Sequence, residues 1–424
     1  RDVEEILKSI PSIGDRLLHT AERVKNSLKY LLVPGMLFED LGFTYIGPVD
    51  GHNLDSLIMM LEESKKINGP VLVHVLTQKG RGYAPAEKNP DKFHGISAFE
   101  VQTGQKLPSV PAGIKTYTEV FSKTLMELAE QDSSITAITA AMPDGTGLNA
   151  FAQKYPERFF DVGIAEQHAA TLAAGMAAAG LKPVLALYST FAQRAYDQIL
   201  HDICLQNLPV IMALDRAGLV GDDGATHHGV FDLSYLSALP NVVVMAPKDE
   251  AELRNMLYTA CKLDCPVAVR YPRGAGLGVP IDQPFELLEL GKAEKLRNGD
   301  GRVALVGVGS MVHTAECVAD KLSREGINVQ VINARFVKPF DMELLVELAK
   351  AGTKLVTLEE NMKSGGFGSN VLLALAEAGC LNKNGVMCIG IGDRFVPHGN
   401  KAALYSEQGL DVETLAAKVR EFSK

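Results

Sequence analysis

Two long stretches of the chain alternate short apolar runs with segments of helical periodicity, and this alternation restricts the fold more than any other feature. Strands separated by helices indicate βαβ units, in which helices cover both faces of a mostly parallel sheet. The sequence therefore predicts the α/β class, with two such sheets in tandem. The apolar runs lie at residues 135–142, 182–189, 209–215 and 241–247 in the first stretch, and at 302–310, 327–335, 353–361 and 386–392 in the second.

Changes in composition divide the chain into three blocks. Residues 1 to about 66 have an amphipathic helical pattern broken by turns, and residues 71–76 are a candidate for a buried strand. Residues 84–113 are rich in Pro, Lys, Asn and Ser and have little periodicity, which is typical of a connection between domains. We therefore expect domains at 1–112, 113–285 and 286–424.

Composition and charge limit the class of partner. The chain has 424 residues, of which 46% are hydrophobic and 22% charged, and its formal net charge is −9. A basic footprint for nucleic acid is absent from the sequence, as is an apolar run of the length that a membrane span needs. Six cysteines without CxxC spacing predict reduced thiols rather than a zinc site. We expect small-molecule ligands and a cytoplasmic location.

The first residue is Arg1, with neither an initiator methionine nor a signal-like segment before the helical pattern begins. From this we expect that the native N-terminus is missing. A plastid location therefore stays open.

Three polar loops are candidates for ligand or metal binding. Residues 221–229 contain two acids and two adjacent histidines, but neighbouring histidines seldom reach one ion, which favours a substrate loop. Residues 307–312 follow a strand candidate yet lack the third glycine of the dinucleotide fingerprint. Residues 364–370 suit an anion, although a sharp turn from strand to helix also explains their glycines. No metal ligand is predicted in this chain.

The segment DVGIAEQHA at residues 161–169 places Glu166 at the start of an Ala- and Gly-rich run. Apolar surroundings disfavour the charged form of a carboxyl group, which suits a group that shares a proton with a ligand. A glutamate at a helix start also serves as a cap or an ion-pair partner. On the residues alone, this second interpretation is the default.

Several long motifs of the chain resemble the 1-deoxy-D-xylulose-5-phosphate synthase family of the transketolase superfamily, in the same order and at similar spacings. The resemblance covers all three blocks. It implies a remnant of the diphosphate-binding domain in 1–112, a pyrimidine-binding domain in 113–285 and a C-terminal transketolase-like domain in 286–424. The motifs are YIGPVDGHN, KGRGYAPAEKNPDKFH, DVGIAEQHA, LYSTFAQRAYDQILHD, DRAGLVGDDGATHHGVFDLSYL and VRYPRG.

The resemblance implies a transferase that depends on thiamine diphosphate and Mg²⁺. The family condenses pyruvate with D-glyceraldehyde 3-phosphate and releases carbon dioxide, which is the first step of the non-mevalonate isoprenoid pathway. The product also feeds thiamine and pyridoxal biosynthesis. A homodimer is implied as well.

The resemblance also implies roles for single residues. Glu166 would bond the ring nitrogen N1′ of the pyrimidine and favour its imino tautomer. Phe191 would stack on the pyrimidine, and Tyr83 would be a further cofactor contact. His94 and His227 would be the catalytic histidines that move protons, whereas His228 and His52 have weaker claims. The residues implied in substrate binding are Arg216, Arg273, Tyr188, Arg194 and Asp223.

The chain also departs from the family. The family binds Mg²⁺ through a Gly-Asp-Gly motif and a downstream Asn in its N-terminal domain, and no such triplet stands in an N-terminal position here. We therefore expect the metal ligands in a missing domain, a separate N-terminal fragment as a candidate partner, and an inactive chain when it is alone.

Two alternatives stay open. The first is another enzyme of the superfamily, either a transketolase or the β subunit of a 2-oxoacid dehydrogenase, although that subunit is not expected to carry the motifs at 45–53 and 79–94. The second is a cofactor-free dimerisation scaffold, which has no need of the polar set around Glu166.

Overall fold

The computed structural model describes residues 36–424, except 91, 97, 108–109, 112 and 382–384. The chain divides into two compact units, Arg1–Ser109 and Val110–Lys424. The helical pattern expected before residue 36 lies outside the described residues.

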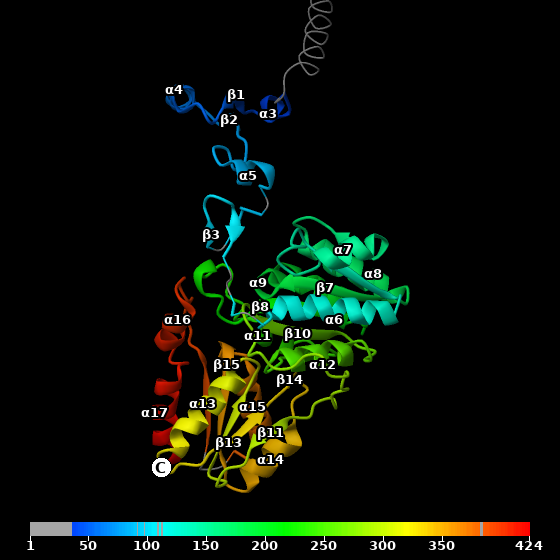
Figure 1. Ribbon diagram of the computed structural model, residues 1–424, viewed down its shortest axis with the longest axis vertical. Helices are drawn as coiled ribbons and strands as arrows, with labels where there is room; N and C mark the ends of the chain where they lie inside the picture. The colour runs from blue at the N-terminus through cyan, green and yellow to red at the C-terminus, as the bar shows by residue number, and fades with distance from the viewer. Residues whose placement is uncertain (1–35, 91, 97, 108–109, 112, 382–384) are drawn as a thin grey trace, which may run out of the picture. The chain divides into compact units, whose positions relative to one another are not determined.

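The first unit is built around a parallel pair of strands (Figure 1). The predicted strand at residues 71–76 is confirmed as β2. Residues 44–50 lie in the region expected to be helical and broken by turns, but they form a strand because they pair with β2 from Thr44 opposite Val71. The elements are α3 (Met36–Asp40), β1 (Thr44–Asp50), α4 (Leu54–Ser64), β2 (Val71–Leu76), α5 (Ala84–Lys88), β3 (Phe99–Glu100) and β4 (Gln105–Lys106).

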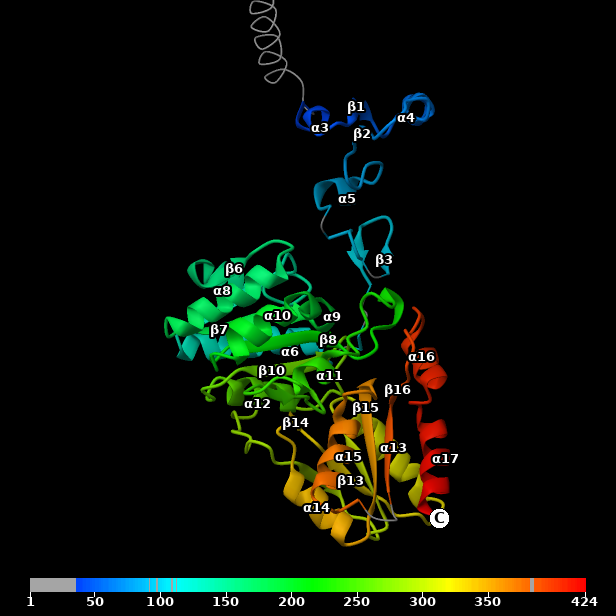
Figure 2. The same ribbon diagram turned by 180° about the vertical axis from the view of Figure 1, so that it is seen from behind.

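The second unit contains a seven-stranded sheet with the order β14-β9-β10-β8-β7-β5-β6 (Figures 1 and 2). Neighbouring strands are parallel except at the edge, where β14 is antiparallel to β9. The four predicted apolar runs of this block each contribute one strand. The strands are β5 (Ile135–Thr139), β6 (Phe159–Asp161), β7 (Lys182–Tyr188), β8 (Ile211–Ala217), β9 (Val243–Met245), β10 (Val267–Pro272) and β14 (Phe336–Lys338).

A five-stranded sheet with the order β11-β13-β12-β15-β16 follows in the same unit. It is parallel apart from β11, which pairs antiparallel with β13. The second set of predicted apolar runs supplies four of its strands, all except β11, and the predicted α/β class is confirmed. The strands are β11 (Glu294–Arg297), β12 (Val303–Gly307), β13 (Gln330–Asn333), β15 (Lys354–Met362) and β16 (Val386–Ile391).

Helices cover both sheets, and five of the principal ones, α6, α12, α14, α16 and α17, begin after a residue whose side chain caps the first turn. Thr116 and Glu119 form a capping box that starts α6, because each side chain bonds the other residue's backbone N–H. In α8 the buried face consists mostly of alanines, which lets the helix approach β7 closely. The principal helices are α6 (Tyr117–Gln131), α8 (Glu166–Ala178), α11 (Asp232–Ser237), α12 (Glu250–Ala260), α13 (Met311–Ser323), α14 (Met342–Lys350), α15 (Phe367–Glu377), α16 (Lys401–Gln408) and α17 (Val412–Ser423).

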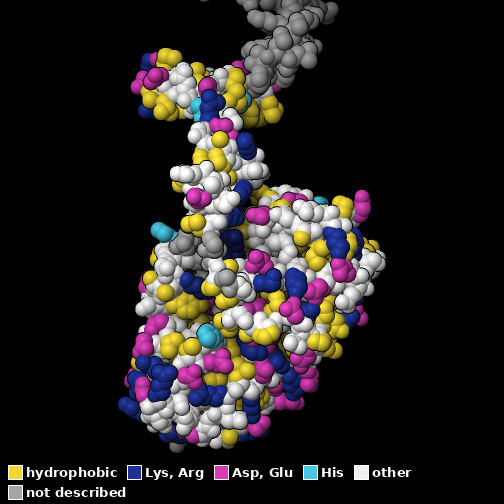
Figure 3. Space-filling model, viewed as in Figure 1, with side chains coloured by type: hydrophobic (Ala, Val, Ile, Leu, Met, Phe, Trp, Pro, Cys, Tyr) yellow, Lys and Arg dark blue, Asp and Glu magenta, His cyan; other side chains and the backbone are white. Residues whose placement is uncertain are grey.

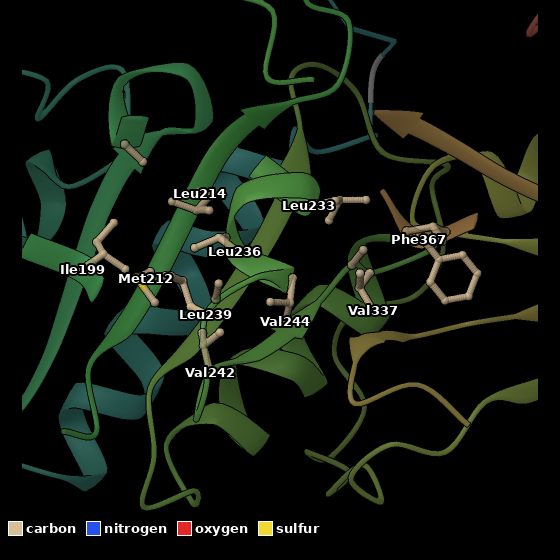
Figure 4. Close-up of a cluster of buried hydrophobic side chains, with 14 of the residues drawn as sticks. Ile199, Met212, Leu214, Leu233, Leu236, Leu239, Val242, Val244, Val337 and Phe367 are labelled. Carbon is tan, nitrogen blue, oxygen red and sulfur yellow. The ribbon is translucent and has the colours of Figure 1, made fainter. Parts of the chain in front are cut away.

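One apolar core continues from the larger sheet to the smaller one. Leu214 on β8, Val244 on β9, Val337 on β14 and Phe367 on α15 belong to a single buried cluster (Figure 4). Strand β14 lies beyond residue 286 in the sequence yet completes the larger sheet. The two sheets are therefore joined by packing and by the chain itself, because β14 follows β13 of the smaller sheet in sequence and pairs with β9 of the larger one.

Surface charge and helix length are the two properties that matter for binding nucleic acid and for crossing a membrane. Figure 3 shows basic and acidic side chains interspersed on the face in view. Among the described residues, no helix has the length and apolar character that a membrane crossing requires.

Candidate active site

Most of the polar residues predicted for the site lie near the carboxyl edge of the seven-stranded sheet. Tyr188 ends β7 and is paired in register with Asp215 on β8, whereas Pro272 at the end of β10 lies opposite Ala217. The loops that leave these three strands therefore begin side by side. In open α/β sheets this edge is where ligands bind.

Glu166 is the first residue of α8, directly after the turn that follows β6. Only 3% of the residue is exposed, and Arg194 Nη1 donates to its Oε1 over 2.8 Å. A negative charge is favoured at a helix N-terminus. The ion pair expected as the default is thus present, with Glu166 buried and Arg194 exposed over 54% of its side chain.

An aromatic group lies next to this ion pair. Phe191, in the short helix α9 (Ser189–Ala192), stacks on Tyr188 with ring centroids 5.4 Å apart and an interplanar angle of 19°. The imidazole of His227 meets Phe191 edge-on at 5.4 Å, and the Arg194 guanidinium lies 5.3 Å from the Phe191 ring centre. Phe191 thus joins the acidic end of the site to His227.

Two arginines share one carboxylate at the other end of the site. Asp223 Oδ2 accepts from Arg216 Nη1 at 2.9 Å and from Arg273 Nη1 at 2.7 Å. The Arg216 guanidinium also lies 3.9 Å from the centre of the Tyr188 ring, where a cation is attracted to the aromatic face. Arg216 has a φ of +61°, a conformation that is uncommon for residues other than glycine and often found at functional sites.

The second unit thus brings eight of the predicted site residues into one chain of contacts. Tyr83 and His94 belong to the first unit, where the Tyr83 hydroxyl donates to Val101 O at 2.7 Å and His94 is exposed. His52 accepts from Gln78 N at 2.7 Å in that unit. The eight residues in contact are Glu166, Arg194, Phe191, Tyr188, His227, Arg216, Asp223 and Arg273.

Asp215 is a polar residue of this site that the sequence analysis missed. It is fully buried next to Arg216, and burial raises the pKa of its carboxyl group to about 6. Thr118 donates to Oδ2 at 2.7 Å, whereas Oδ1 has no hydrogen-bond partner among the residues that the structure describes. Its position at the end of an apolar run, directly before Arg216, was the available signal. Burial also raises the pKa of Tyr188 to about 12.

A second missed group links this site to the smaller sheet. Arg270 on β10 is buried and binds Asp232 through Nε and Nη2, at 2.9 and 3.1 Å. The same Nη2 donates to Gly229 O at 3.1 Å and Glu360 O at 3.3 Å. A buried arginine is stable only when its donors are satisfied in this way. The group fixes residue 229, where the loop of Asp223 and His227 ends.

Among the described residues, no group of three or more His, Cys, Asp or Glu side chains could hold a metal ion. A Gly-Asp-Gly triplet does occur, at residues 299–301 before β12. Its Asp300 pairs with Arg302 Nη2 at 2.6 Å, which is a local structural role. The glycine-rich residues 364–370 also have a structural role, because Phe367 N and Gly368 N donate to Glu359.

Comparison with known proteins identifies the three blocks. The family model of 1-deoxy-D-xylulose-5-phosphate synthase matches residues 1–77. The pyrimidine-binding domain of transketolase matches residues 115–277, and the transketolase C-terminal domain matches residues 291–415. The eight contacting residues all lie in the second of these matches.

Relatives match the chain over almost its whole length. The 1-deoxy-D-xylulose-5-phosphate synthase of Pelotomaculum thermopropionicum is 57% identical over 99% of this chain and 65% of the relative. Synthase 1 of Geobacter sulfurreducens is 54% identical, over 100% of this chain and 66% of its own length. The chain therefore spans just under two thirds of these relatives.

Solved structures agree with this assignment. A split gene transketolase, described as an inactive β4 tetramer, is 33% identical with a TM-score of 0.64, over 73% of this chain and 98% of its own. The transketolase of Campylobacter jejuni shares the fold at 16% identity and a TM-score of 0.62, over 93% of this chain and 70% of its own. The chain belongs to the 1-deoxy-D-xylulose-5-phosphate synthase family of transketolase-type proteins.

Proposed function

We propose that this chain is the pyrimidine-binding and C-terminal part of a 1-deoxy-D-xylulose-5-phosphate synthase. The complete enzyme condenses pyruvate with D-glyceraldehyde 3-phosphate, releases carbon dioxide and supplies isoprenoid, thiamine and pyridoxal biosynthesis. Thiamine diphosphate, when bound, supplies the carbanion chemistry of the condensation. The observation that carries the proposal is the buried Glu166, whose ion-pair partner Arg194 lies over the ring of Phe191.

The residues at this end of the site fit an aminopyrimidine ring. The Glu166 carboxyl group offers a hydrogen-bond partner for a ring nitrogen, and its burial strengthens such a bond. Phe191 offers a flat apolar surface for stacking, although the ring of Tyr188 now covers one of its faces. In this proposal Glu166 orients the pyrimidine and shares a proton with its N1′, while Arg194 keeps the carboxylate in place.

Arg216 and Arg273 are suited to an anionic substrate group. A guanidinium pairs with carboxylate or phosphate oxygens through parallel N–H donors, and each arginine uses one terminal nitrogen on Asp223. Their remaining donors are the proposed binding site for the phosphate of glyceraldehyde 3-phosphate or the carboxylate of pyruvate. Asp223 holds both cations ready, and this lowers the cost of ordering them when substrate binds.

His227 is proposed to move protons to and from the substrate, since an imidazole has one nitrogen that can donate and one that can accept a proton, and this ring lies against Phe191. Tyr188 is proposed as a further substrate contact from the same edge. We propose that the first unit contributes Tyr83 to cofactor binding and His94 to proton transfer. The proposed domain limits are 1–112, 113–285 and 286–424.

The rest of the cofactor site is proposed to lie outside this chain. Mg²⁺ prefers carboxylates together with phosphate oxygens, and the described residues hold no cluster of such ligands. The split gene transketolase is a precedent for a fold of this family divided between genes. We propose that a second polypeptide or a further part of the protein supplies the diphosphate and Mg²⁺ ligands, and that the chain alone is inactive.

We also propose a homodimer that works in the cytoplasm. Ile164 lies two residues before Glu166 and is 81% exposed, which places an apolar side chain on the surface next to the buried acid. Close packing of a second copy would remove such a side chain from water.

The test is product formation by the chain co-expressed with the third of the Pelotomaculum thermopropionicum relative that it does not match. With thiamine diphosphate and Mg²⁺, pyruvate and glyceraldehyde 3-phosphate should yield 1-deoxy-D-xylulose 5-phosphate and carbon dioxide. Glu166→Gln should remove at least about 99% of turnover, whereas Glu130→Gln, which changes an exposed acid paired with Lys154, should not. Turnover with a ketose donor instead of pyruvate would identify a transketolase, and full turnover by Glu166→Gln would refute the assignment.

A further inference from the structure

The loop that carries Asp223 and His227 makes hydrogen bonds to two segments in the C-terminal part of the chain. We call residues 218–229 the active-site loop and residues 393–399 the clamp loop. Leu219 N donates to Glu360 Oε1 on β15 at 2.6 Å. Gly399 N of the clamp loop donates to Gly221 O at 3.3 Å. The active-site loop is therefore held from outside its own sheet.

His228 lies between the two loops and uses both of its ring nitrogens there. Only 3% of the residue is exposed. Val220 N lies 3.1 Å from Nδ1, and Pro397 O lies 3.0 Å from Nε2. A backbone N–H only donates and a carbonyl oxygen only accepts, so Nδ1 must be the acceptor and Nε2 must carry the hydrogen. His228 is thus a neutral crosslink between the loops, with no nitrogen left for a substrate.

The crosslink leads directly to the arginine pair. His228 holds the N–H of Val220, and the carbonyl of the same residue accepts from Arg273 Nη1 at 3.2 Å. That nitrogen also binds Asp223, which in turn binds Arg216. The orientation of Val220 therefore affects both the guanidinium of Arg273 and its shared carboxylate.

We propose that His228 is a positioning residue, through which the clamp loop sets the geometry of the Arg216–Asp223–Arg273 group. The anchoring stands on its own contacts, whereas its effect on catalysis rests on the proposed function. The C-terminal domain then contributes to the substrate site, because Pro397 orients the imidazole of His228 and this imidazole in turn holds Val220. His227 meets the ligand and its neighbour His228 supports the loop.

The first measurement is hydrogen exchange of the purified 424-residue chain, followed by mass spectrometry of peptides that cover residues 217–230. His228→Leu should speed exchange of the Val220 amide about tenfold, because one protecting hydrogen bond is lost. His228→Gln should restore the protection, since an amide side chain can accept from Val220 and donate to Pro397. His201→Leu is the matched control, because His201 is exposed and lies elsewhere in the same unit. Equal exchange in the Leu variant and the natural chain would overturn the anchoring.

The second measurement uses the complete enzyme described under the proposed function. His228→Leu should raise KM for glyceraldehyde 3-phosphate about tenfold with a smaller change in kcat, and His228→Gln should bring KM back. A loosened loop with unchanged KM and kcat would overturn the positioning role. If the natural enzyme forms no product, the proposed function fails, and the anchoring is then decided by hydrogen exchange alone.

Discussion

Replacing Asp223 by Asn should strengthen the binding of inorganic phosphate to the arginine pair. Asparagine keeps an oxygen that accepts from Arg216 and Arg273, so the positions of the guanidinium groups are retained. The substitution removes one negative charge about 5 Å from a bound anion. With an effective dielectric constant of about 40–60, between the values for a protein surface and for water, this repulsion amounts to about 1–2 kcal/mol, or roughly a 5- to 30-fold gain in affinity. The lost ion pairs should lower stability by only about 1 kcal/mol.

Isothermal titration of the 424-residue chain with phosphate at low salt measures this effect. Asp300→Asn is the control, because it makes the same change in net charge at an exposed pair with Arg302. The Asp300 variant should bind phosphate like the natural chain. If Asp223→Asn binds no more tightly than Asp300→Asn, the carboxylate does not compete with an anion at this pair, and the reasoning is refuted.

Two further predictions concern buried groups around the site. The pKa of Asp215 is raised to about 6, so its contribution to stability is full below about pH 4 and is lost as the pH rises through 6. Asp215→Asn should therefore gain up to about 3 kcal/mol relative to the natural chain between pH 4 and pH 7, as measured by urea unfolding; parallel pH profiles would contradict this. Gly218→Ala should cost about 3–5 kcal/mol, because Gly218 has a φ of +78° and an added Cβ would overlap the Glu360 carboxyl group. Gly180→Ala, with a φ of +86° and open space, should cost only about 1–2 kcal/mol, and equal losses would show that the contact with Glu360 is unimportant.

The predictable part of the fold was the part set by local periodicity. The apolar runs of both sheets became strands because each is long enough to be buried between helices. Strand β1 was missed because its Gly47 and Pro48 resemble a turn, and its pairing with β2 depends on residues about 25 positions away. Strand β14 was equally hidden, since residues 336–338 complete a sheet whose other strands end at Pro272.

The candidate site also has a part that the sequence could predict and a part that it could not. Glu166, Arg216 and Arg273 stand beside strand ends or at a helix start, where sequence position alone indicates a shared edge. The supporting contacts join residues that are far apart in the chain, such as Thr118 with Asp215 and Leu219 with Glu360. No local pattern encodes these pairs, because the first arises when α6 packs on the larger sheet and the second when the two sheets pack together.

The most direct test of the central claim is the exchange rate of the thiazolium C2 proton of thiamine diphosphate bound to the complete enzyme. Proton NMR after transfer to deuterated buffer measures this rate in the natural enzyme, in Glu166→Gln and in the control Glu130→Gln. If Glu166 is the carboxyl group that bonds N1′, the Gln variant should bind the cofactor and exchange its proton at least about 100-fold more slowly, with the control unchanged. Equal exchange rates in Glu166→Gln and the natural enzyme, with cofactor bound in both, would contradict the account.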